Sequence, residues 1–187
     1  MKRVSKLVLG VCLAIGLAIA FTGCATNKDG TYKVTVSNYY RDKSVPWQEQ
    51  ALIMPIAPRN GSVGTVNVVN ASNRTILACQ ADVGVIPAGT HTLYVYLMGY
   101  TNALIQSTRY ETTTPIQISY DFQPGGRYVL IGSVKKKLFT ADYTVEIKTL
   151  DEYYALPDES PGDKKMKNEH VPKIFAQIEA QLNSESQ

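Results

Sequence analysis

Side chains that could act as nucleophiles or metal ligands are scarce in this chain of 187 residues, which holds three cysteines and two histidines. A zinc site takes three or four ligands at ordered spacing, and no cluster of acidic residues accompanies His91 or His170. We therefore expect no metal and no other cofactor. Cys79 ends an apolar run without a nearby histidine to activate it, which predicts a buried, unreactive thiol.

Acidic pairs and serines give no stronger indication of catalysis. Asp151-Glu152 and Asp158-Glu159 lie beside turn or linker residues, whereas acid–base pairs of carboxylates work in a concave, partly desolvated setting. The mature part of the chain also has no Gly-x-Ser-x-Gly elbow. We expect no catalytic residues and no enzymatic activity. The alternative is a hydrolase with a site assembled from scattered residues, and a deep polar pocket joining His91 to an acid and a hydroxyl would favour it.

Cys24 stands in the best-defined motif of the sequence. Residues 1–6 are basic, residues 7–20 form an apolar run, and Phe21-Thr22-Gly23-Cys24 follows directly. The apolar run has the length of a signal-peptide core and is short for a membrane span. This arrangement resembles the lipobox of bacterial lipoproteins, in which small residues precede a cysteine. An uncleaved signal anchor and an ordinary secretory signal are the alternatives.

The lipobox resemblance implies a lipid anchor. In that family the chain is cut before the cysteine, whose thiol carries a diacylglycerol and whose new amine is acylated, for example with palmitate. Residues 1–23 would then be the signal peptide, Cys24 the lipidation site and residues 24–30 a tether. By analogy with sorting in bacteria that have two membranes, Ala25 and Thr26 favour an outer-membrane over an inner-membrane location in the cell envelope. Three acyl chains hold a protein on a membrane far more firmly than one.

The charge of the chain is unevenly distributed. There are 19 basic and 16 acidic residues, and Lys2, Arg3 and Lys6 supply the whole excess. The part that would remain after cleavage is neutral. Nucleic-acid binding requires a clustered positive field, so we expect no nucleic-acid partner.

The body of the chain, residues 31–156, alternates between apolar and polar residues as β-strands do. Turn residues recur at the spacing of short strands, which favours a mainly β fold. We predict an antiparallel β-sandwich or open barrel of about eight or nine strands. Pro55 and Pro58 make 51–56 an edge strand or an irregular segment. Pro124-Gly125-Gly126 fits a turn, which predicts a hairpin between strands 116–122 and 127–134.

Two segments of this body resemble a known type of module. Residues 86–95, Ile-Pro-Ala-Gly-Thr-His-Thr-Leu-Tyr-Val, and residues 120–130, Tyr-Asp-Phe-Gln-Pro-Gly-Gly-Arg-Tyr-Val-Leu, resemble turn entries of small uncharacterised β-sandwich modules in envelope lipoproteins. Those modules are similar in outline to PEGA-type and transthyretin-like domains. The resemblance covers residues 60 to 150 approximately and brings no catalytic residues with it.

The C-terminal part has a different pattern. Residues 157–169 are polar and predict a linker. Residues 170–187 form a helix and tail, since Ile174, Ile178 and Leu182 recur every four residues and Pro172 lies in the first turn. This short amphipathic helix could dock on the sheet or project toward a partner or membrane.

Aromatic and basic side chains are the clearest hints of an interaction surface. Tyr94 and Tyr96 point away from the stripe of Leu93, Val95 and Leu97, and exposed tyrosines are common at binding surfaces. The candidate surface residues are Tyr94, Tyr96, Trp47, Lys135, Lys136 and Lys137. We interpret the chain as a lipid-anchored, non-enzymatic envelope lipoprotein that binds a protein or glycan partner or serves as a structural accessory module.

Overall fold

In a computed structural model, the fold is mainly β as predicted, and the described residues form two five-stranded sheets. The prediction of about eight or nine antiparallel strands was wrong in detail, because ten strands are described and two of the pairings are parallel. The structure describes residues 26–56, 63–101, 108–136 and 141–186. The chain divides into two compact units, residues 1–33 and 34–187. In the first unit, Thr26 and Tyr32 form an antiparallel bridge. Between them the Asp29 carboxylate accepts hydrogen bonds from the Thr31 hydroxyl and backbone N–H, which lowers the pKa of Asp29.

The first sheet of the second unit is mixed, with the order β1-β5-β2-β9-β10. Its strands are β1 (Thr35–Ser37), β2 (Ala51–Ile56), β5 (Asp82–Ile86), β9 (Arg127–Lys136) and β10 (Ala141–Thr149). The prediction for 51–56 was wrong, because β2 is the central strand, antiparallel to β5 and parallel to β9. Its pairing with β5 ends at Ile53. Pro55 lies beyond the end of this pairing, so no hydrogen bond to β5 requires the backbone N–H that proline lacks.

The second sheet is antiparallel and consists of β3 (Val63–Val69), β4 (Thr75–Leu77), β6 (Gly89–Thr101), β7 (Thr108–Glu111) and β8 (Ile116–Phe122). The long strand β6 pairs with β3 along one edge. Along its other edge it pairs first with β8 and then with β7. Between these two partners, the Leu97 carbonyl accepts a hydrogen bond from the Thr112 backbone N–H at 3.0 Å. The two sheets do not close into a barrel in the part of the chain described.

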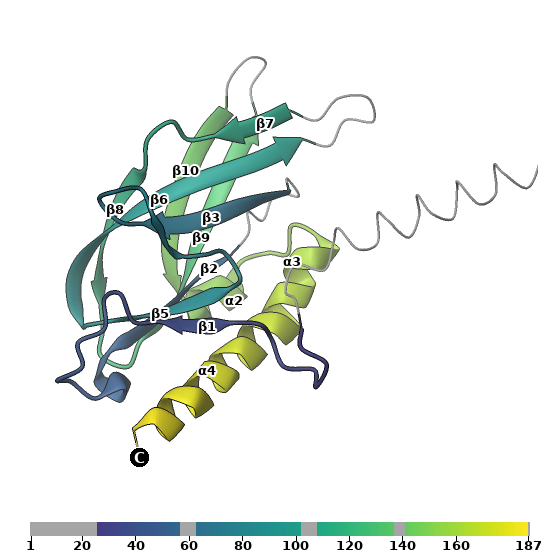
Figure 1. The fold of residues 1–187 in the computed structure, drawn as a ribbon. Coiled ribbons are helices and arrows are strands. Elements are labelled where there is room, and N and C mark those ends of the chain that lie inside the picture. Colours follow the sequence, from purple (N-terminus) through teal and green to yellow (C-terminus); the bar gives the residue numbers. More distant parts are fainter. Residues whose placement is uncertain (1–25, 57–62, 102–107, 137–140, 187) are drawn as a thin grey trace, which may run out of the picture. The chain divides into compact units, whose positions relative to one another are not determined.

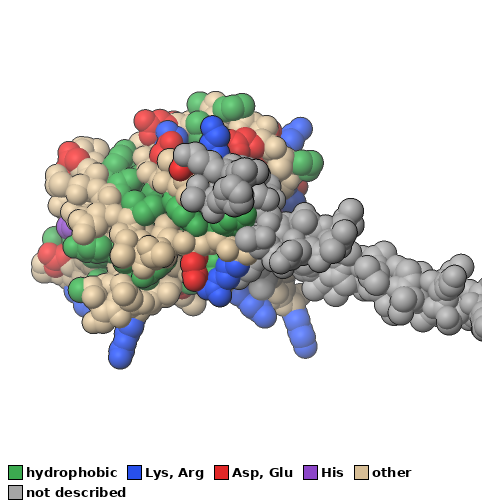
Figure 2. All heavy atoms as spheres, turned by 90° about the horizontal axis from the view of Figure 1, so that it is seen from above, with side chains coloured by type: hydrophobic (Ala, Val, Ile, Leu, Met, Phe, Trp, Pro, Cys, Tyr) green, Lys and Arg blue, Asp and Glu red, His purple; other side chains and the backbone are tan. Residues whose placement is uncertain are grey.

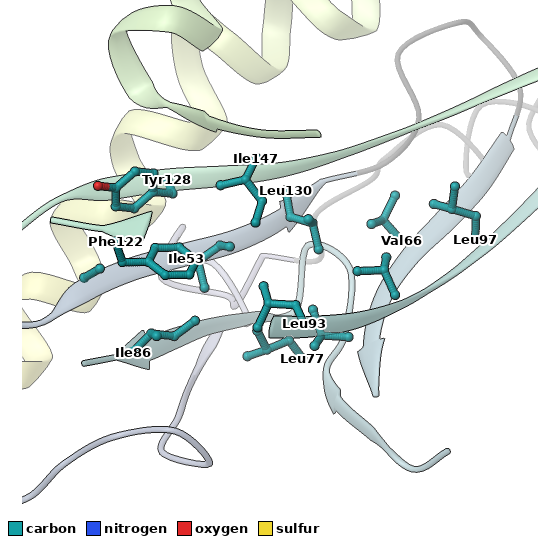
Figure 3. Packing of buried hydrophobic residues seen from close by; sticks show 13 residues of the cluster. Ile53, Val66, Leu77, Ile86, Leu93, Leu97, Phe122, Tyr128, Leu130 and Ile147 are labelled. Carbon is teal, nitrogen blue, oxygen red and sulfur yellow. The ribbon is translucent and has the colours of Figure 1, made fainter. Parts of the chain in front are cut away.

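Side chains from both sheets form one buried cluster (Figure 3). Ile53 and Leu130 contribute from the first sheet, and Val66, Leu93 and Leu97 from the second. The sheets approach closely at Gly132, where a Cβ atom would lie 2.2 Å from Leu97 Cδ2. Burial of these apolar groups is the main stabilising term of the fold, at about 25 cal/mol per Å² of apolar surface.

The turn at Pro124-Gly125-Gly126 links the two sheets, so the predicted hairpin was wrong. β8 pairs with β6 in the second sheet, while β9 pairs with β2 and β10 in the first. The turn chemistry itself is as expected, with Gly125 at φ +67°. The Gln123 backbone N–H donates to the Tyr128 hydroxyl at 2.9 Å, and Tyr128 packs against Gly126 so closely that a Cβ atom there would clash. The connection at 87–88 likewise joins β5 of the first sheet to β6 of the second.

Helical turns follow the last strand and end in a long helix (Figure 1). A short 3₁₀ turn, η1 (Trp47–Glu49), precedes β2, and α2 (Leu150–Ala155) follows β10. The helix then runs without interruption through α3 (Pro161–Lys165), the π-helical turn η2 (Met166–His170) and α4 (Val171–Glu185). Residues 157–169 were predicted as a linker, and the structure instead places most of them in the first turns of this helix. The Ser160 side chain accepts a hydrogen bond from the Asp163 N–H and caps its start.

A buried lysine fixes the beginning of the long helix. Lys167 is 5% exposed. Its ammonium group donates to the Leu156 carbonyl and to Asp158, the latter at 3.0 Å, and lies 3.9 Å from the buried Asp163 carboxylate. The same group lies 5.6 Å from the centre of the Tyr153 ring. A buried charge needs such partners, so this cluster ties the helix to the segment that follows α2.

The apolar stripe of α4 is buried against the outer face of the first sheet. Val171, Ile174, Phe175, Ile178 and Leu182 are each at most 3% exposed. Ion pairs join Glu179 to Arg127 at the start of β9 and Glu185 to Arg41. Leu52, Met54, Val85 and Val129 point away from the core cluster and are also buried. Among the helices described, none is long and apolar enough to cross a membrane.

Candidate functional site

The outer face of the second sheet is the most distinctive surface of the second unit. Alternation along β6 turns Leu93, Val95 and Leu97 inward, so Tyr94, Tyr96 and Met98 lie on the outer face. Thr65 and Asn67 share that face on β3, because they pair directly with Met98 and Tyr96. All five side chains are partly exposed. No helix in the described part of the chain takes the place over them that α4 takes over the first sheet.

A hollow of about 170 Å³ lies on this outer face. Its residues come from β3, the turn before β4, β4, β6 and β7. They are Thr65, Asn67, Val69, Asn73, Thr75, Tyr96, Leu97, Met98 and Glu111. Val69 and Leu97 are at most 2% exposed, and the polar side chains with Tyr96 and Met98 supply the more exposed part of the lining. Drug-sized ligands occupy sites of about 300–1,000 Å³, so the hollow suits a smaller group.

Several polar side chains in the hollow have unused hydrogen-bonding capacity. Within the part of the chain described, the hydroxyls of Thr65, Thr75 and Tyr96 make no hydrogen bond to protein. The Asn67 amide oxygen accepts a hydrogen bond from the Cys79 N–H at 2.9 Å, which fixes the amide and leaves its NH₂ group available. The Glu111 carboxylate pairs with Arg109, and both side chains are more than half exposed. The hollow therefore offers donors, acceptors and one negative charge.

Two further tyrosines, Tyr39 and Tyr40, lie near this face. The Tyr39 and Tyr40 rings meet edge to face with their centres 5.0 Å apart, and Tyr39 is 56% exposed. Burial raises the pKa of Tyr40 to about 12, and the nearby Tyr39 and Tyr94 hydroxyls add to the effect. Tyr94 thus lies close enough to Tyr40 for their charges to interact. Tyr39 and Tyr40 therefore lie near Tyr94.

The other predicted surface residues do not join this face. Trp47 is only 6% exposed, so its assignment to an exposed surface was wrong: the turn η1 folds it inward. Lys135 is exposed on β9 opposite Asp142. Lys136 belongs to the same strand, but its side chain is not among those that the structure describes. Lys137 and Cys24 lie outside the described residues.

The histidines and Cys79 lie outside the hollow. The centre of the His91 ring is 6.1 Å from that of Phe122, at the opposite end of β6. Burial lowers the pKa of His170, with the nearby Lys165 as a further cause. Cys79 is partly exposed rather than buried, because β4 ends at Leu77 and Cys79 lies in the following turn. No group of three potential metal ligands occurs among the residues described.

Basic and acidic side chains both occur on the face seen in Figure 2, where apolar side chains gather across the middle and most charged groups lie toward the margins. Among the described residues of this face, the two signs are interspersed.

Sequence patterns singled out Tyr96, which lines the hollow, and Tyr94, which lies on the same face outside it, but none of the other lining residues. Thr65, Asn67 and Glu111 belong to strands whose pairing with β6 decides which residues become neighbours. Alternation predicts that they face outward, and nothing in the sequence predicts the strand order. No protein-family model, curated protein or solved structure matches this chain.

Proposed function

We propose that this protein is a lipid-anchored envelope lipoprotein, without catalytic activity, that binds an envelope partner through the outer face of its second sheet. The observation that carries the binding role is the contrast between the two outer faces. The C-terminal helix covers the first sheet, while the aromatic and polar side chains on the second sheet remain accessible.

The composition of that face supports a binding role. Tyrosine adds large contact area and a polar tip at low entropic cost, and it is enriched where proteins recognise partners. The face combines Tyr94 and Tyr96 with the hydroxyl and amide groups of Thr65 and Asn67. The neutral charge of the chain after residue 23 favours a protein or a glycan over a nucleic acid.

Attachment to the membrane is the second part of the proposal. It rests on the basic start, the apolar run and the Phe21-Thr22-Gly23-Cys24 motif. The hydrophobic contribution is about 0.8 kcal/mol per buried acyl CH₂, so a triacylated Cys24 would keep the domain at the membrane surface. Lys135 and its neighbouring lysines could then add attraction to anionic headgroups.

The anchor is tested with Cys24→Ala and, as a matched control, Cys79→Ala. We expect Cys24→Ala to abolish labelling by radioactive palmitate and to release the protein from the membrane fraction. Cys79→Ala should be labelled and sedimented like the wild type. Unchanged labelling and sedimentation of Cys24→Ala would refute the anchor.

The binding role is tested by chemical cross-linking in intact envelopes. The wild type, a Tyr94→Ser/Tyr96→Ser double variant and Tyr154→Ser would be purified, and the bound protein and sugar identified. Tyr154 is the control because it is an exposed tyrosine on α2. We expect the double variant to lose a cross-linked partner that Tyr154→Ser retains. Identical adducts from all three proteins would contradict a role for this face.

A further inference from the structure

We infer that the hollow between Tyr96, Thr65, Thr75 and Glu111 binds a single neutral sugar ring, so that the partner of the second sheet is a glycan. This inference rests on the proposed function, because it names the ligand of the same face. Three properties of the hollow point to this ligand: its size, its mixture of aromatic and polar groups, and its charge.

The size limits the ligand to one small ring. A volume of about 170 Å³ is well below the range for drug-sized molecules, and the hollow is open to solvent along the sheet. A glycan could therefore place one residue in the hollow while the rest of its chain continues over the surface. An extended peptide usually binds along the edge of a sheet, where backbone groups are unpaired. The hollow instead opens on the outer face, over the paired strands β3 and β6.

The lining matches the two sides of a sugar ring. The C–H face of a pyranose is apolar and can lie on the Tyr96 ring, which offers a flat apolar surface. The hydroxyls at the ring edge need donors and acceptors. Thr65 and Thr75 can both donate and accept, and the Asn67 NH₂ group can donate. These groups make no competing hydrogen bonds to described residues, so none of the hydrogen bonds described is lost when the sugar binds.

The charge selects among sugars. Glu111 is the charged residue that lines the hollow, and its carboxylate can accept hydrogen bonds from sugar hydroxyls. Hydrogen bonds to an ionised acceptor are stronger than neutral ones. The same carboxylate repels an acidic sugar. Arg109 pairs with Glu111 but is not among the lining residues, so it compensates this repulsion only in part. The hollow therefore favours neutral sugars over uronic acids.

The test measures sugar binding to the full-length lipidated protein, held in a detergent without a sugar headgroup. The probes are glucose, galactose and N-acetylglucosamine, with glucuronate as the acidic counterpart of glucose. Binding is measured by saturation-transfer NMR and titration. We expect at least one neutral sugar to bind with a dissociation constant in the millimolar range, as befits so small a ligand. Glucuronate should bind about tenfold more weakly than glucose.

Variants locate the binding in the hollow. Tyr96→Leu should weaken binding of the neutral sugar about tenfold. The control Tyr154→Leu removes an exposed ring on α2, outside the lining of the hollow, and should leave binding unchanged. Thr65→Val/Thr75→Val is a second variant that keeps side-chain shape, and Glu111→Gln is a third. Both should weaken binding about three- to tenfold, so the inference remains testable if Tyr96→Leu fails to fold.

The result also separates this inference from the proposed function. Absence of binding by all three neutral sugars overturns the glycan inference. Equal binding of glucose and glucuronate, or an equal loss in Tyr154→Leu and Tyr96→Leu, overturns it as well. If the Tyr94→Ser/Tyr96→Ser variant nevertheless loses a cross-linked protein that the wild type retains, the proposed function stands with a protein partner. If neither sugar nor protein depends on the face, both fail.

Discussion

The two sheets present opposite outer faces. On the first sheet, Leu52, Met54 and Val129 point away from the core and are at most 2% exposed. This burial is expected if the apolar stripe of α4, whose Glu179 pairs with Arg127 of β9, packs on this face. On the second sheet, the corresponding positions of β3 and β6 carry Thr65, Asn67, Tyr94 and Tyr96, which remain partly exposed. One outer face thus extends the hydrophobic core, and the other faces solvent with groups suited to binding.

This difference explains the composition of the strands. A strand buried on both faces reads as a continuous apolar run, and one buried on a single face alternates. β2, with the sequence Ala-Leu-Ile-Met-Pro-Ile, is buried at every position, whereas β8 alternates. The helix therefore contributes to stability through the first sheet, and the second sheet can vary its outer face at little cost in stability.

The strongest test of this contrast replaces the same residue type on each outer face. Met54 is fully buried and Met98 is partly exposed. We expect Met54→Ala to lower the free energy of unfolding by about 3 kcal/mol, since it leaves a cavity under the helix. Met98→Ala should cost less than about 1 kcal/mol. Urea denaturation measures both, and equal losses would show that the two faces are equally buried.

A substitution at the start of the long C-terminal helix is expected to have the next largest effect on stability. Lys167→Ala removes the cation between Asp158, Asp163 and the Leu156 carbonyl, and leaves the Asp163 carboxylate buried without it. We expect a loss of about 2 kcal/mol, below the full cost of breaking a buried pair because Asp158 is 42% exposed. Lys165→Ala, on an exposed position of α3, should change stability by less than about 0.5 kcal/mol. Two matching denaturation curves would contradict a role for the Lys167 cluster.

The connection between the sheets is expected to show a smaller effect. Tyr128→Phe removes the hydroxyl that accepts the Gln123 N–H, and we expect a loss of about 1 kcal/mol. Tyr120→Phe is the control, since its hydroxyl makes no hydrogen bond to the residues described. A Tyr120→Phe variant less stable than Tyr128→Phe would mean that ring packing, rather than this hydrogen bond, holds the crossover.

The smallest expected effect is a dependence of stability on pH that arises from Tyr40. The pKa of Tyr40 is about 12 in the folded protein against about 10 for a free tyrosine. The folded state therefore holds its proton longer, and stability falls as pH rises from 10 toward 12. Ultraviolet titration should find one tyrosine ionising near pH 12 that is lost in Tyr40→Phe. Ionisation of Tyr40 near pH 10 would contradict its burial.

Local sequence patterns predicted the positions of strands and turns better than they predicted which strands pair. Alternation located β6, β8 and β10, and Pro124-Gly125-Gly126 located a turn. The same turn residues fit a hairpin or a crossover equally well, since the choice depends on which distant strand each neighbour pairs with. The prediction from Pro55 that 51–56 is an edge strand was wrong for a related reason. The missing N–H of a proline matters only where a neighbouring strand would accept its hydrogen bond. The mixed pairing of β2 is likewise a long-range property.

The helical tail shows a different limit. Residues 157–169 contain few apolar side chains, so hydrophobic periodicity gives no helix signal there. The capping residues Ser160, Pro161 and Asp163 are nevertheless a typical helix start. They stabilise the first turns together with Lys167, whose burial depends on partners that only the folded chain brings together. The hollow was missed for the same reason, because its lining comes from four separate segments.

Site-specific photo-cross-linking shows most directly which face of the protein touches a partner in the cell. A photoreactive benzoylphenylalanine would replace Tyr96 in one variant and Tyr154 in another, since both are accessible tyrosines of the same chain. Irradiation of intact envelopes should give an adduct from position 96 and none from position 154. An adduct from position 154 with none from position 96 would contradict binding at the second sheet.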